Sequence, residues 1–72
     1  MTAAADMVEG YLDGLRDDRL DPPAPGNRGA CYWHGWLNGR DDRIGAPRAP
    51  ASTLRVLASA AIALDLLAGI HA

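Results

Sequence analysis

Two proline-rich breaks divide this 72-residue chain and limit what it can fold into. The first break, residues 21–28, holds three prolines, and the second, residues 44–51, holds two. Proline cannot continue a helix, and it drives the residue before it toward extended backbone. The sequence therefore predicts one all-α domain of three helices, over about residues 2–20, 29–43 and 52–70.

The first segment shows the periodicity of an amphipathic helix, and Thr2 is placed to cap it. Apolar residues recur at spacings of three and four: Ala4, Met7, Val8, Tyr11, Leu12 and Leu15. Gly10 and Gly14 interrupt this pattern, and each costs about 1 kcal/mol relative to Ala inside a helix. We interpret the two glycines as a place where another backbone approaches closely.

An internal repeat is the most specific feature of the sequence. Residues 10–14 read Gly-Tyr-Leu-Asp-Gly and residues 35–39 read Gly-Trp-Leu-Asn-Gly. Arg-Asp-Asp-Arg follows in both copies, after the additional Leu15 in the first and directly in the second. Two copies indicate two equivalent helices, each with an aromatic side chain between two glycines. We expect these helices to pack against each other as an antiparallel hairpin.

The repeat and the segments around it resemble the ribosome modulation factor family. The resemblance covers about residues 7–43: Gly10-Tyr11, Gly14, a loop with proline, then Tyr32 and Gly35-Trp36. It implies a small, helical, non-enzymatic protein that binds the small ribosomal subunit and drives ribosomes into inactive dimers. The chain departs from the family in its acidic charge, its shorter loop without Cys-Pro-Tyr, and the extra residues 44–72.

If the resemblance extends to the partner, arginine and tryptophan side chains would contact a ribosome or another nucleoprotein complex through phosphates and stacked bases. This candidate partner-binding set is Arg28, Trp33, Trp36, Arg40, Arg43 and Arg48. The alternative for both tryptophans is a place in the hydrophobic core.

Charge is separated along the chain, although the net charge is only −2. Six carboxylates and two arginines occupy residues 1–21, whereas four arginines and two aspartates occupy residues 22–51. The acidic first helix suggests an alternative function, an inhibitor of the phage anti-CRISPR type that blocks a basic nucleic-acid groove. Its acidic face would be Asp6, Glu9, Asp13, Asp17 and Asp18.

The sequence gives little support for a metal site or for a cysteine nucleophile. Cys31 is the only cysteine, so it excludes an internal disulfide, and it shares a helical spacing only with His34. A structural metal needs about four ligands, and a cysteine nucleophile needs a base that is itself oriented by a third group. We therefore predict no catalytic residue, no cofactor and no metal.

The third segment, Leu54–Ile70, is apolar on nearly every side, and Ser52 or Thr53 is placed to cap it. It is short for a membrane span and contains Arg55 and Asp65, so we expect a cytoplasmic protein. One side of such a helix would stay uncovered by a two-helix hairpin, which predicts a homodimer or burial in another protein's groove.

Overall fold

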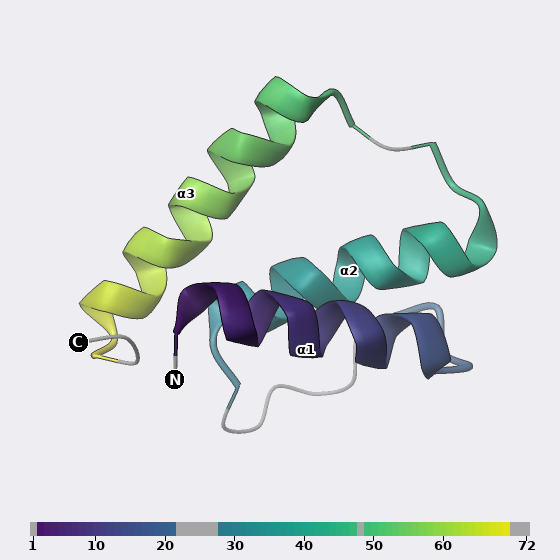
Figure 1. The fold of residues 1–72 in the computed structure, drawn as a ribbon, viewed down its shortest axis with the longest axis horizontal. Helices are drawn as coiled ribbons and strands as arrows, with labels where there is room; N and C mark the ends of the chain where they lie inside the picture. Colours follow the sequence, from purple (N-terminus) through teal and green to yellow (C-terminus); the bar gives the residue numbers. More distant parts are fainter. Residues whose placement is uncertain (1, 22–27, 48, 70–72) are drawn as a thin grey trace.

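The computed structural model describes residues 2–21, 28–47 and 49–69. Within these residues the chain forms three helices and no strand: α1 (Ala3–Arg16), α2 (Ala30–Ile44) and α3 (Ala51–Leu67) (Figure 1). The predicted all-α, three-helix class is confirmed. Arg48 and Ile70 lie outside the described residues, as does most of the proline-rich loop predicted at 21–28.

The ends of α1 follow from side chains close to them. Thr2 caps its first turn as predicted, because its Oγ1 accepts the N–H of Ala5 at 3.1 Å. The helix ends at Arg16, before the predicted residue 20, since Asp17 is extended. The carboxylate of Asp17 accepts the backbone N–H of Arg19 at 3.0 Å, which stabilises a turn in place of another helical turn.

The other two helices begin without a cap from their own segments. Gly29 precedes α2 and has no side chain to offer. Pro50 precedes α3, and no side chain caps that helix, so the predicted capping by Ser52 or Thr53 is wrong. Gly45 ends α2 in the left-handed conformation with φ 71°, which glycine adopts without a steric penalty.

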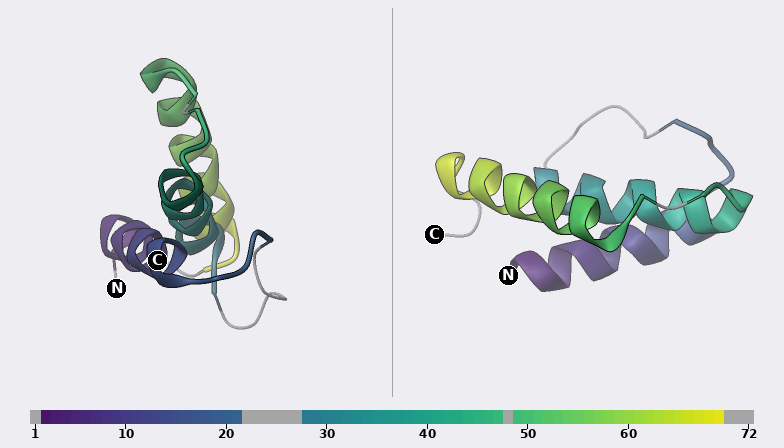
Figure 2. Two further views of the ribbon diagram at one scale, coloured as in Figure 1. Left: turned by 90° about the vertical axis from the view of Figure 1, so that its right-hand side faces the viewer. Right: turned by 90° about the horizontal axis from the view of Figure 1, so that it is seen from above.

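Helices α1 and α2 lie side by side and run in the same direction (Figures 1 and 2). The antiparallel arrangement expected for them is therefore wrong. Contacts pair early residues with early ones and late with late: Glu9 with Arg28, Asp13 with Tyr32 and Gly14 with Arg43. The connecting segment, residues 17–29, is long enough to return along α1, since an extended chain spans about 3.3 Å per residue and a helix rises about 1.5 Å.

The four glycines of the repeat form the α1–α2 interface. A Cβ atom on Gly10 or Gly14 would overlap the carbonyl oxygen of Tyr32 or Trp36, and one on Gly35 or Gly39 would overlap that of Met7 or Tyr11. Each helix thus places its glycines against the backbone of the other. This confirms the interpretation of the glycines as sites of close backbone approach.

This packing changes which face of α1 is buried. The buried residues are Asp6, Gly10 and Gly14, spaced by four along one side of the helix. Val8 and Leu12, which belong to the predicted apolar stripe, remain exposed. Met7, Tyr11 and Leu15 of the stripe are only half-buried, so the closest contact of α1 with α2 is made by the glycines.

Helix α3 returns toward the start of α2 and packs on it along a narrow strip. Its buried residues are Ala61 and Asp65, while Leu54 and Ala58 on the same side are half-buried. In Figure 1 its C-terminal end lies near the beginning of α2, and its first turns diverge from the rest of the fold. Much of α3 is therefore left uncovered.

Candidate binding surfaces

The arginines predicted to contact a partner use their donors inside the chain. Arg28 forms an ion pair with Glu9 at 2.7 Å, and its guanidinium carbon lies 3.9 Å from the centre of the Tyr32 ring. Arg40 donates to the carbonyl oxygen of Leu20 at 2.8 Å. Arg43 donates to the carbonyl oxygen of Gly14 at 3.1 Å. Arg28 and Arg43 therefore bind α1, whereas Arg40 binds the segment that follows α1. Arg48 lies outside the described residues.

The two tryptophans differ in exposure. Trp36 is 1% exposed and is the largest fully buried side chain among the described residues, which supports the core interpretation for it. Trp33 is half-buried, with its ring edge-on to Tyr32 at a centroid distance of 4.8 Å. Only Trp33 of this pair keeps part of its ring available to another molecule.

The acidic face expected on the first helix is turned largely toward α2. Asp6 is buried, and Asp13 accepts a hydrogen bond from the hydroxyl of Tyr32 at 2.6 Å. The side chain of Arg19 binds Asp17 at 2.8 Å and lowers the pKa of that carboxyl well below its usual range. Asp18 is exposed. Most of these carboxylates therefore stabilise the fold, and they do not form one open acidic surface.

Asp65 has a role that the sequence interpretation missed. It is 1% exposed, and its two carboxylate oxygens accept the N–H groups of Ala30 at 2.6 Å and Cys31 at 2.9 Å. These are the first N–H groups of α2, which Gly29 leaves without a cap. A residue of α3 therefore caps α2 from across the fold. The available signal was a single carboxylate in an otherwise apolar stretch.

The Cys31 thiol lies beside this cap and is fully buried. Burial, together with a hydrogen bond to Asp65 and the charge of that carboxylate, raises the pKa of Cys31 to about 12. The thiol is thus protonated at neutral pH and is a poor nucleophile. Among the described residues, no three His, Cys, Asp or Glu side chains gather as they would around a metal ion.

The largest uncovered apolar surface belongs to α3. We call Leu57, Ala60, Leu64 and Leu67 the outer stripe. At about 100° of rotation per residue they lie along one flank of α3, beside the residues that pack on α2. All four are exposed, with Leu64 at 58% and Leu67 at 86%. Covering each leucine would recover roughly 1–2 kcal/mol, since full burial of such a side chain is worth about 1.5–3 kcal/mol.

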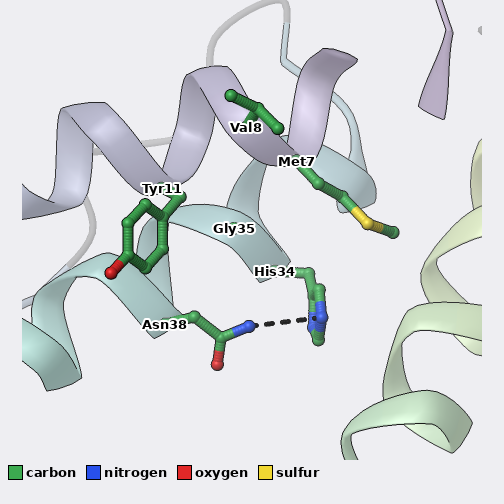
Figure 3. A pocket seen from close by; sticks show the side chains of 6 residues that line it. All are labelled: Met7, Val8, Tyr11, His34, Gly35 and Asn38. Atoms are coloured by element: carbon green, nitrogen blue, oxygen red, sulfur yellow. Dashed lines mark hydrogen bonds between the residues drawn. The ribbon is translucent and has the colours of Figure 1, made fainter. Parts of the chain in front are cut away.

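Two shallow hollows lie on the α1–α2 pair. One has a volume of about 290 Å³ and is lined by Met7, Val8, Tyr11, His34, Gly35 and Asn38 (Figure 3). The amide nitrogen of Asn38 lies 3.3 Å from Nε2 of His34 across its floor. The second hollow, about 300 Å³, has both arginine and aspartate in its lining, so it presents no net charge of one sign.

The exposed apolar surface of α3 also raises the question of a membrane span. No helix among the described residues is both long enough and apolar enough to cross a bilayer.

The comparisons with known proteins give no relative for this arrangement. No family model, no curated protein and no solved structure matches the chain.

Proposed function

We propose that this chain is a small non-enzymatic binding protein that attaches to a protein partner through the outer stripe of α3. The observation that carries the proposal is the exposure of its leucines, above all Leu64 and Leu67. Exposed apolar patches of this kind mark interaction sites in soluble proteins. Three of the arginines predicted to contact phosphates, Arg28, Arg40 and Arg43, in contrast bind groups of the chain itself.

The proposed partner is a protein of a large nucleoprotein complex, with the ribosome as the first candidate and the cytoplasm as the location. The resemblance of residues 7–43 to the ribosome modulation factor family suggests this choice of complex, and the outer stripe lies outside those residues. Because Arg40 and Arg43 donate to carbonyl groups of the chain itself, the contact would be made with a protein and not with RNA phosphates.

Co-sedimentation with ribosomes at two salt concentrations tests this proposal. Binding through several phosphates falls by about 10³–10⁵ between 50 and 200 mM salt, whereas burial of apolar surface is little affected. We expect co-sedimentation to persist at the higher salt concentration.

Two variants of α3 complete the test. Leu64→Glu places a charge on the outer stripe, and Leu66→Glu places the same charge on a side chain of similar exposure, 53%, on another side of the helix. We expect Leu64→Glu to abolish binding and Leu66→Glu to retain it. Steep loss of binding with salt, together with full binding by Leu64→Glu, would overturn the proposal.

A further inference from the structure

We infer that a second copy of this chain covers the outer stripe in the free protein, with the two α3 helices packed antiparallel. The inference rests on the proposed function, since both use the same face of α3. It goes further by naming the occupant of that face before any other partner is bound.

The spacing of the outer stripe suits another helix. Leu57, Ala60, Leu64 and Leu67 follow one another at intervals of three, four and three residues. This is the spacing of the seam along which two helices pack with side chains fitted into the gaps of the facing helix. All four residues lie within α3, on its exposed side.

The sizes of these side chains fit a second copy. In an antiparallel pair related by a two-fold axis, Ala60 of one copy faces Leu64 of the other, and Leu57 faces Leu67. Each central layer then joins a small side chain to a large one, which fills space without overlap. A two-fold contact makes each favourable layer twice.

Charge does not oppose the contact. Arg55 is exposed on another side of α3, and Asp65 is buried against α2, so the outer stripe itself is uncharged. Two identical stripes can therefore meet without placing like charges together. A strongly charged partner surface would gain nothing from this stripe.

The hollow of Figure 3 is a poor alternative binding site for the outer stripe of another copy. Its volume is about 290 Å³, and polar groups of His34 and Asn38 form part of its lining. These two groups lie 3.3 Å from each other, and a row of three leucines would exclude water from their remaining donors and acceptors. A second α3 leaves no such group buried at its outer stripe.

Sedimentation of the full chain over a range of concentrations tests the inference. Four residues from each copy make a small interface, so we expect weak association. Monomer and dimer should both be present at chain concentrations between about 5 and 500 µM. Leu64→Glu should weaken association at least about tenfold, while Leu66→Glu, the matched control, should associate like the unmodified chain. A monomer at the highest concentration, or equal weakening by both variants, would contradict the inference.

Cross-linking determines the direction of the helices. Ala60→Cys and Leu64→Cys chains, each also carrying Cys31→Ala, are oxidised separately and as a mixture. Antiparallel packing predicts a disulfide only in the mixture, between the two different chains. Disulfides within each separate sample would show parallel packing and overturn the arrangement.

Each proposal can fail without the other. If the chain is monomeric but Leu64→Glu still loses ribosome binding, the second copy is rejected and the proposed function stands. If the chain dimerises through the outer stripe but ribosome binding is independent of Leu64, the dimer stands and the proposed function is rejected.

Discussion

The α1–α2 pair and α3 are held in place in opposite ways. In the pair, Gly10 and Gly14 bring the two backbones into contact, and side chains of each helix bind groups of the other. Helix α3 packs through Ala61 and Asp65 and leaves Leu57, Leu64, Leu66 and Leu67 exposed. The difference indicates that the pair supplies the stable scaffold and α3 supplies the surface for a partner.

The packing of α1 on α2 also changes the role assigned to the charged residues of the repeat. The Arg-Asp-Asp-Arg ends of the repeat suggest a surface for a charged partner when read as sequence. In the structure, Arg43 donates to the carbonyl oxygens of Gly14 and Arg19, and Asp42 accepts from Tyr11. These charges therefore bind the two copies of the repeat to each other.

The largest expected effect comes from filling the contact between the backbones. Gly14→Ala would favour the isolated helix by about 1 kcal/mol, but its methyl group would overlap the carbonyl of Trp36. Because backbone must move to make room, we expect a loss of about 3 kcal/mol or more in the free energy of unfolding. Urea denaturation followed by circular dichroism measures this loss.

The control for this variant is Gly45→Ala. Its added methyl group meets nothing within 4 Å, and only the positive φ opposes it, so we expect a cost of about 1–2 kcal/mol. If Gly14→Ala were as stable as the unmodified chain, the scaffold would not depend on close backbone contact.

The next effect concerns the attachment of α3. Asp65→Ala leaves the N–H groups of Ala30 and Cys31 without their acceptor, and we expect a loss of about 2–3 kcal/mol. The loss should be local, with α3 released and the α1–α2 pair intact. Labelling of the Cys31 thiol with Ellman's reagent should then become faster, whereas Ser59→Ala, at an exposed site on α3, should leave the rate unchanged.

Substituting one arginine in the α1–α2 pair and one in α3 compares how much each region contributes to stability. Arg43→Gln removes charge-assisted hydrogen bonds between the helices of the pair, and we expect a loss of about 1–2 kcal/mol. Arg55→Gln changes an exposed residue of α3, and its effect should stay within about 0.5 kcal/mol. Thermal unfolding of both variants measures the difference, and equal effects would contradict the assignment of Arg43 to the scaffold.

The smallest effect is visible at alkaline pH. Burial and the hydrogen bond to Asp13 raise the pKa of Tyr32 from 10.0 to about 12, so the fold favours the protonated hydroxyl. This stability is complete below pH 10 and declines as the pH rises toward 12, because the unfolded chain releases the proton first. Tyr32→Phe should cost about 1 kcal/mol at neutral pH.

The pH dependence of unfolding tests the same residue. Buried Cys31 adds a similar decline from pH 9.0 upward, since its pKa is also raised to about 12. Tyr32→Phe should therefore lose less stability than the unmodified chain between pH 10 and 12, while keeping the Cys31 contribution. Identical pH profiles for the two proteins would show that Tyr32 is not protected by the fold.

The sequence alone determined the number of helices, their approximate bounds and the part of the fold where backbones meet. Prolines end helices by local geometry, and glycines repeated at intervals of four mark a close approach whichever way the partner helix runs. For that reason the repeat gave no information on direction. A short connection would have forced an antiparallel pair, but residues 17–29 can span either arrangement.

Only the tertiary structure decided that α1 and α2 are parallel, that Asp65 caps α2, and that the arginines bind the chain itself. Asp65 and Ala30 are 35 residues apart and belong to different helices, so no local pattern links them. The carboxylate of Asp65 meets those N–H groups because α3 packs beside the start of α2, with Ala61 and Asp65 buried. A charged side chain has the same sequence signature whether it meets a partner or its own backbone, and the packing of the helices determines which of the two it meets.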